Sequence, residues 1–276
     1  MSLEHIEIGS FAPPQPRSET TDVLRIVSWN INRGSCFDLI LDFLDSTNAG
    51  LILLQECDSN ALRSECRNIA KELAERLKMN YVFGIEFREL SQGTGNTAGY
   101  HGQATLSREP LFNPRILRFS HQSGFWKPRW FIPNTPRMQR RLGGRMALVT
   151  EIVLDGRGMA VYNLHLESRG GDSLRSRQLS EVFVDAQQYG TETPVVLAGD
   201  FNFDVSRSAC AIQQAGYRSL FAKESQDTTT KISRLRNSRA IDWILIRGPL
   251  ASHGACVHTL ASGSDHYPLS LIVRPT

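Results

Sequence analysis

Polar side chains that can bind a metal ion or activate water recur where short apolar runs of this sequence end. The runs are typical of strands, and strand ends at one edge of a sheet converge in space, where α/β folds build their sites. The polar residues at these ends are Asn30, Asn32, Glu56, His165, Glu167, Asp200, Asn202, Asp242, Asp265 and His266. We therefore expect one site, assembled from motifs spread over the whole chain.

These residue types suit the hydrolysis of phosphate esters. A hard cation such as Mg²⁺ takes oxygen ligands from one or two carboxylates and keeps positions for water and phosphate, and Glu56 and Asp265 can supply those carboxylates. A general base must generate hydroxide near the phosphorus, for which Asp200 and His266 are candidates. Asp242 can orient an imidazole. Asn and His donors can stabilise charge on the phosphoryl oxygens.

Taken singly, these residues also have simpler structural interpretations. Asn30 and Asn32 are common turn residues, and Asp200 with Asn202 suits an Asx turn. His165 alternates with leucines, as a polar-face strand residue would. The complete set, rather than any one member, favours a catalytic site.

The ordered set resembles the endonuclease/exonuclease/phosphatase superfamily, over about residues 23–273. The matching motifs are Ser28-Trp29-Asn30, Leu54-Gln55-Glu56, Asn163-Leu164-His165-Leu166, Gly199-Asp200-Phe201-Asn202, Ile241-Asp242-Trp243 and Ser264-Asp265-His266-Tyr267-Pro268. The resemblance implies a four-layer α/β sandwich of two packed mixed β-sheets flanked by helices. It also implies a divalent-metal-dependent phosphoester hydrolase.

For the metal, the resemblance implies that Glu56 is a ligand of Mg²⁺ or Mn²⁺, with Asn32 and Asp265 as the other candidate ligands. The segment His165-Leu166-Glu167-Ser168 is similar to one in the tyrosyl-DNA phosphodiesterase branch. That branch has an Asp where this chain has Asn32. The missing carboxylate implies a single-metal site that depends on Glu56.

For the phosphate, the resemblance implies a role for each remaining motif. The implied catalytic residues are Asp200 and Asn202, which position the attacking water, Asp242, which orients His266, and His165, which holds the phosphate together with Asn30. Members of the superfamily differ over which residue is the general base, so this assignment stays open between Asp200 and His266.

A basic, aromatic stretch over residues 108–145 bears on the substrate. It contains nine basic residues, one acidic residue and six interleaved aromatic residues, and residues 231–239 form a second basic run without acids. Cations interleaved with aromatics suit phosphate backbones and unpaired bases, although a solvated face over core aromatics is the plain alternative. The expected substrate-binding cations are Arg137, Arg140, Arg141 and Arg145, and the expected stacking residues are Trp126 and Trp130.

Two functions follow from this reasoning. The first is a nuclease or another DNA- or RNA-processing phosphodiesterase. The alternative is a phosphatase or phosphodiesterase for small-molecule or lipid phosphates, of the inositol phosphate or sphingomyelin type, in which the cations bind an anionic head group. A catalytically inactive binding module is disfavoured because Glu56, Asp200, Asp242 and His266 are all present.

The elements that must position these motifs are strands interrupted by a few helices. Apolar runs predict strands over residues 23–27, 51–54, 102–107, 111–119, 146–154, 159–166, 194–198, 241–246, 255–260 and 269–273. Helical periodicity is found around residues 37–44, 62–77 and 179–186. A turn signal at Asp155-Gly156-Arg157-Gly158 predicts a hairpin. Hairpins exclude a purely parallel sheet, which favours two packed mixed sheets.

The bulk properties allow one large domain. The 276 residues are 41% hydrophobic, and we expect a mobile N-terminal arm over residues 1–20 and a single catalytic domain over residues 21–276. The net charge of +3 favours no partner. Five cysteines without CxxC spacing argue against a disulfide framework or a zinc site and favour a cytoplasmic location. No apolar run approaches the roughly 20 residues of a membrane span, and we expect a monomer.

Overall fold

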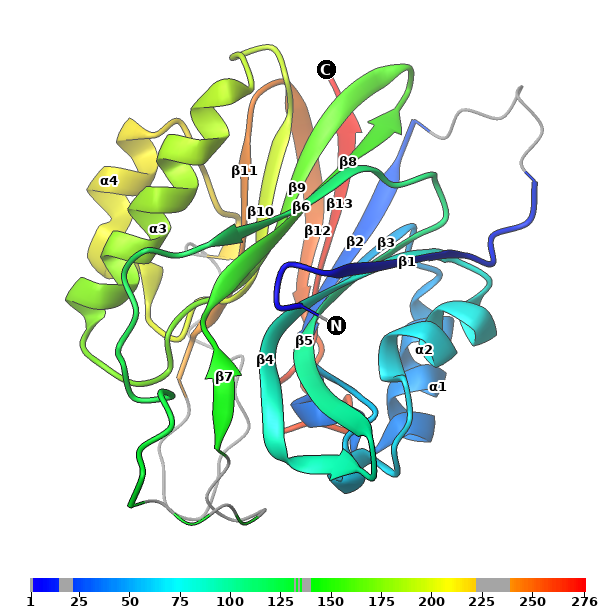
Figure 1. Cartoon of the computed structure of the whole chain (residues 1–276). Coiled ribbons are helices and arrows are strands. Elements are labelled where there is room, and N and C mark those ends of the chain that lie inside the picture. Colours follow the sequence, from blue (N-terminus) through cyan, green and yellow to red (C-terminus); the bar gives the residue numbers. More distant parts are fainter. Residues whose placement is uncertain (1, 15–21, 132, 134, 136–139, 222–238) are drawn as a thin grey trace.

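Four layers build the molecule, in the order helices, sheet, sheet, helices (Figure 1). The computed structural model describes residues 2–14, 22–131, 133, 135, 140–221 and 239–276. The strands are β1 Ile6–Ser10, β2 Leu24–Asn30, β3 Leu51–Ser59, β4 Asn80–Thr94, β5 Thr97–Ser107, β6 Phe112–Arg118, β7 Arg141–Gly143, β8 Met146–Leu154, β9 Arg157–His165, β10 Val195–Asp200, β11 Asp242–Arg247, β12 Leu250–Val257 and β13 Leu269–Pro275. The α-helices are α1 Phe37–Thr47, α2 Ile69–Leu77, α3 Asp172–Asp185 and α4 Ala209–Gln214.

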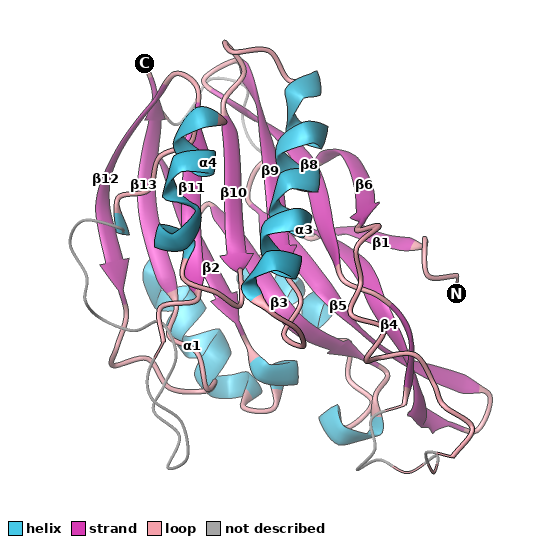
Figure 2. Ribbon diagram, turned by 90° about the vertical axis from the view of Figure 1, so that its left-hand side faces the viewer, coloured by secondary structure: helices cyan, strands magenta, loops and turns pink. Residues whose placement is uncertain are grey.

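Both sheets are mixed, as the sequence predicts. One has the order β1-β4-β5-β3-β2-β13-β12, with β7 added to β4, and the other has the order β11-β10-β9-β8-β6. The pairs β2–β3 and β9–β10 are parallel, whereas the remaining strand pairs are antiparallel. Helices α3 and α4 cover the outer face of the five-stranded sheet (Figure 2), and α1 and α2 cover the other sheet. The expected α/β sandwich is confirmed.

Side-chain alternation along the central strands fills two cores. Ile26 and Leu53 face the second sheet and belong to the core between the sheets. Val27, Ile52 and Leu54 point the opposite way and pack with the apolar residues of α1 and α2. Because successive strand residues point to opposite faces, an apolar run such as 51–54 is required where both faces are covered.

The segment at residues 6–10 differs from the sequence-based expectation. Residues 1–20 are predicted to form a mobile arm, but Ile6–Ser10 forms β1 and pairs antiparallel with β4. The Tyr81 hydroxyl also donates to Glu7 Oε1 at 2.6 Å. The prediction is wrong for this segment because the edge of β4 offers unpaired backbone groups, which a short run with alternating isoleucines can satisfy.

Two further elements differ in extent. The apolar runs of the sequence do not predict β4, although this strand carries several residues of the site described below. The helix predicted around residues 62–77 begins only at Ile69, where the Asn68 side chain accepts from the Lys71 N–H at 3.2 Å as an N-cap. Glu65 and Cys66 have φ near +56°, which interrupts the helical pattern before that cap. No helix in the described part of the chain is long and apolar enough to cross a bilayer.

Candidate active site

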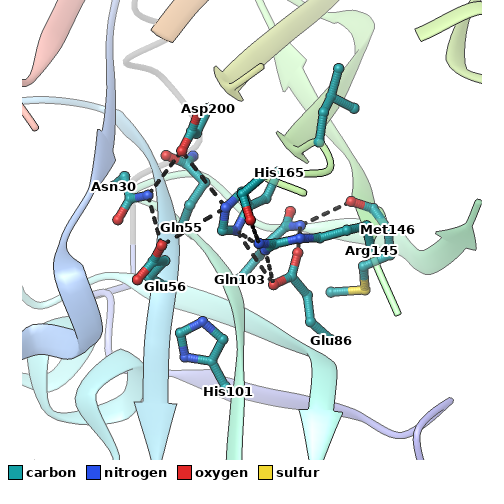
Figure 3. Close-up of polar contacts among 12 residues, drawn as sticks. Asn30, Gln55, Glu56, Glu86, His101, Gln103, Arg145, Met146, His165 and Asp200 are labelled. Carbon is teal, nitrogen blue, oxygen red and sulfur yellow. Dashed lines mark hydrogen bonds and ion pairs between the residues drawn. The ribbon is translucent and has the colours of Figure 1, made fainter. Parts of the chain in front are cut away.

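The strand ends that carry the sequence motifs meet at one edge of the two sheets. Asp200 ends β10 opposite His165 of β9 and Asp242 of β11. Asn30 ends β2 in the other sheet, and its Nδ2 donates to Asp200 Oδ2 at 3.1 Å (Figure 3). This buried hydrogen bond links the two sheets at the edge. The predicted convergence of these residues is therefore observed.

Glu56 reaches this edge because β3 is irregular there. Its register with β5 shifts between Leu54 and Cys57, and Glu56 has φ +57°. A bulge of this kind re-aims a side chain. Gln55 points inward and donates to Asn163 Oδ1 at 2.8 Å, whereas 25% of the Glu56 side chain is exposed. Glu56 is thus the carboxylate that faces the opening of the site.

The environment of Glu56 fits a divalent cation. Burial alone would raise its pKa, but the positive charges around it, those of Arg145 and His266 among them, hold that pKa well below its usual range. Its Oε1 accepts from Asn30 Nδ2 at 3.2 Å, while its Oε2 has no hydrogen-bond partner within the described part of the chain. An ionised, partly exposed carboxylate with a free oxygen suits an ion that takes its other ligands from water and substrate.

The orientation of His165 is set by Arg145. Arg145 Nη1 lies 2.7 Å from His165 Nδ1 and also donates to Glu86 Oε2 at 3.0 Å. A guanidinium can only donate, so Nδ1 accepts and the ring proton is on Nε2. Nε2 lies 3.7 Å from Asp200 Oδ2 and 3.9 Å from Glu56 Oε1. His165 therefore presents an N–H donor to the site.

His266 and Asp242 form a buried pair on the other side of Asp200. His266 Nδ1 lies 3.1 and 2.9 Å from the two Asp242 oxygens, and its Nε2 lies 3.9 Å from Asp200 Oδ2. Burial would lower the pKa of His266, but the charges of Asp242 and Asp200 raise it to about 10. Asp200, Asp242 and His266 offer ligand atoms within 4.8 Å of one another. A protonated imidazole does not bind a cation, which favours Glu56 as the metal residue.

The raised pKa of His266 predicts a pH-dependent contribution to stability. The pKa is about 10 in the folded chain against 6.5 in the unfolded chain, so the pair stabilises fully below pH 6.5, and this stabilisation is lost as the pH rises through 10. We expect Asp242→Asn to lower the free energy of unfolding more at pH 6 than at pH 10. Urea unfolding of both proteins at the two pH values measures this difference. An equal loss at both values would contradict the assigned pKa.

The remaining motif residues are less central. Asn202 donates from Nδ2 to the Leu166 carbonyl at 3.0 Å, and its backbone N–H donates to Asp200 Oδ1 at 2.8 Å. Asn32 is half-buried, and its backbone N–H donates to Asn30 Oδ1 at 3.1 Å. Asp265 is exposed and accepts from Ser264 Oγ at 3.4 Å. Asn202 therefore lies beside Asp200, whereas the structure does not bring Asp265 into contact with Glu56.

The arginines predicted to bind substrate have mostly internal partners. Arg141 is buried, and its Nη2 lies 2.6 Å from Glu89 Oε1. Arg145 is likewise buried and bound to Glu86. Arg140 is half-buried, and Arg137 lies outside the described residues. We interpret Arg141 and Arg145 as residues that position glutamates and His165 rather than as direct phosphate contacts.

Sequence reasoning missed several polar residues of this region. Glu86 lies on β4 beside Arg145 and is completely buried. Asp58 and His101 form a second buried pair, with His101 Nδ1 2.7 Å from Asp58 Oδ1. A carboxylate inside the apolar run at residues 81–87 was the available signal for Glu86, because an isolated buried charge requires a partner.

Comparison with known proteins identifies a family model and similar folds. The family model described as Endonuclease/Exonuclease/phosphatase family matches residues 27–266. The UPF0294 protein YE0917 of Yersinia enterocolitica is 25% identical over 98% of this chain and 90% of its own length. The human Nocturnin catalytic domain, with a bound sulfate anion, has a TM-score of 0.67 at 18% identity, covering 98% of this chain and 97% of its own. A humanized D. rerio TDP2 has a TM-score of 0.62 at 16% identity, covering 92% and 100%.

Proposed function

We propose, from the premise that the chain belongs to the Endonuclease/Exonuclease/phosphatase family, that it is a divalent-metal-dependent phosphodiesterase that acts on nucleic acid. Members of the family are phosphoester hydrolases, which fixes the class of chemistry. The observation that carries the proposal is the position of Asp200. Its Oδ2 lies within 3.9 Å of the Nε2 atoms of both His165 and His266 and accepts from Asn30.

Each of these side chains has a distinct task in the proposed reaction. Asp200 accepts the proton of the attacking water, which Asn202 helps to position. His266 is protonated at neutral pH because of Asp242, so it donates to an oxygen of the phosphoryl group instead of acting as the base. His165 donates to the same group and stabilises its growing negative charge, while Asn30 holds Asp200 and Glu56 in place through its two Nδ2 protons. A divalent ion bound at Glu56 would act as a Lewis acid on a phosphoryl oxygen.

An exposed aromatic segment that follows Trp126 supports a substrate with unpaired bases. Trp126 Nε1 donates to Glu167 Oε1 at 2.9 Å, and Glu167 is two residues beyond His165. Trp130 is 94% exposed and Phe131 is 58% exposed. Exposed aromatic rings beside cations are the features that single strands use for stacking.

We expect Trp130→Ala to weaken binding of a single-stranded oligonucleotide by about 5- to 150-fold, because base stacking contributes about 1–3 kcal/mol per base. The fold should be unchanged, since the Trp130 side chain is exposed. Fluorescence anisotropy measures the affinity. Phe112→Ala is the matched control, because Phe112 is 45% exposed and pairs with Glu151, whose partner on β9 is Ala160, five residues from His165. Equal affinities for all three proteins would remove this support for nucleic acid.

One observation favours a second candidate function. Several cations of the basic stretch are bound internally, such as Arg115 to Asp185 and Arg118 to Glu4. Less positive charge is therefore free for a long polyanion than the sequence indicates. A phosphatase or phosphodiesterase for small-molecule or lipid phosphates needs fewer free cations, and it is the alternative.

A product-resolved assay decides between the two functions. The substrates are single-stranded and duplex DNA, an abasic duplex, RNA, a 5′-tyrosyl DNA, an inositol phosphate and sphingomyelin, each with Mg²⁺ or Mn²⁺. We expect turnover of a nucleic acid, with a rate that falls as salt rises because bound phosphates release counterions. Turnover restricted to the inositol phosphate or sphingomyelin would replace the proposed function by the alternative.

A further inference from the structure

A second carboxylate–histidine pair lies beside the candidate metal residue. Asp58 and His101 are cross-strand partners on β3 and β5. Their side chains are 0% and 3% exposed, and His101 Nδ1 lies 2.7 Å from Asp58 Oδ1. Neither residue belongs to a motif of the resemblance or to the reaction described above. Burying a carboxylate–histidine pair costs desolvation free energy, so this pair requires a structural or functional explanation.

Arg63 fixes the charge and the direction of this pair. Its Nε and Nη2 donate to the two Asp58 oxygens at 2.6 and 2.7 Å, and its Nη2 lies 3.0 Å from Glu89 Oε1. Both Asp58 oxygens therefore accept from a guanidinium, which is the arrangement of an ionised carboxylate. An ionised Asp58 only accepts, so His101 Nδ1 donates to it, and this contact is shorter than the 3.4 Å to Arg63 Nη2. The ring is thereby held with its Nδ1 saturated.

The second nitrogen of His101 has no hydrogen-bond partner within the described part of the chain. In Figure 3 the ring lies next to Glu56, and this nitrogen points toward the side of the Glu56 carboxylate. A purely structural buried histidine usually has both nitrogens bonded. His101 Nε2 therefore faces the site as an unused ligand atom.

We propose that His101 Nε2 is a ligand of the divalent ion held by Glu56, with Asp58 and Arg63 orienting the ring. The inference rests on the proposed function only in that a cation binds at Glu56. A metal-bound imidazole generally donates its other N–H to a carboxylate, and the Asp58–His101 contact has this form. One nitrogen ligand favours Mn²⁺ or another first-row transition ion over Mg²⁺, which prefers oxygen ligands.

Pulsed electron paramagnetic resonance of the Mn²⁺-loaded protein tests whether His101 is a ligand. The nuclear spin of a coordinated imidazole nitrogen modulates the electron spin echo of Mn²⁺. The variant is His101→Asn, whose amide still donates to Asp58 and which lacks only the ligand nitrogen. The matched control is His165→Asn, because the proton on His165 Nε2 prevents that atom from binding the ion. Circular dichroism and urea unfolding check that both variants are folded.

We expect a nitrogen coupling in the wild-type protein and in His165→Asn, and its loss in His101→Asn. The Mn²⁺ affinity of His101→Asn should fall by at least about tenfold, with a smaller change for Mg²⁺. Bound Mn²⁺ without nitrogen coupling in the wild type, or coupling that persists in folded His101→Asn, would overturn the inference. Either outcome is compatible with metal-dependent hydrolysis by the wild-type protein, so the proposed function is judged separately by its substrate assay.

Discussion

Replacing Glu56 by Gln is expected to reduce metal-dependent phosphodiester hydrolysis by about 1,000-fold or more. Lewis-acid stabilisation by a bound metal contributes several kcal/mol to the transition state, and each 1.36 kcal/mol is a factor of ten. Glu56 is the partly exposed carboxylate among the clustered site residues, and its Oε2 has no hydrogen-bond partner among the residues that the structure describes. The amide keeps the shape of the side chain but loses the charge that a hard cation requires. Steady-state rates at increasing Mg²⁺ and Mn²⁺ measure the effect.

The fold control for this variant is thermal unfolding, which should change little. Glu192→Gln is the matched substitution, since Glu192 is exposed and precedes β10 at the end of the strand opposite to Asp200. It should retain the wild-type rate. A Glu56→Gln protein with near-wild-type activity at ordinary metal concentration would refute the assignment of Glu56 as the metal residue.

The second large effect concerns the pair His266–Asp242. We expect Asp242→Asn and His266→Ala each to lower kcat by about 100- to 10,000-fold, the usual contribution of a positioned proton donor. The double variant should lose little more than the single variants, because residues that act as one unit are not additive. Asp242 holds the imidazole through Nδ1 at 2.9 and 3.1 Å and keeps it protonated. Removal of either residue thus eliminates the same function.

A double-mutant cycle of kcat tests this coupling. His253→Ala is the matched control, because His253 is exposed on β12 and its replacement should leave the rate unchanged. Losses that multiply in full, in variants with native circular dichroism, would mean that Asp242 and His266 act independently.

Short local patterns were enough to predict the main motif residues. Asn30, Asp200 and Asp242 each lie directly at the end or start of an apolar strand run, so the motif and the element that positions it are neighbours in sequence. Because strand ends at one edge meet, their convergence followed from the topology alone. Asp265 belongs to an equally local motif, yet it is exposed, since only the next residue, His266, points inward.

The partners of the basic residues could not be predicted in this way. Arg141 binds Glu89 and Arg145 binds Glu86, although the residues of each pair are more than 50 positions apart. Their pairing depends on how β4 and β7 come together, and the sequence gives no local signal for it. A run of basic residues in the sequence can therefore suggest a phosphate-binding surface even though carboxylates inside the fold neutralise the charges of those residues.

The central claim is that this edge of the two sheets catalyses metal-dependent hydrolysis of phosphate diesters. Turnover of bis(p-nitrophenyl) phosphate by the metal-stripped wild-type protein, followed during stepwise return of Mg²⁺ or Mn²⁺, tests it most directly because no natural substrate need be known. We predict no turnover in the presence of a chelator, recovery that saturates with added metal, and no recovery in Glu56→Gln. Turnover that persists in chelator, or recovers equally in Glu56→Gln, would contradict the account.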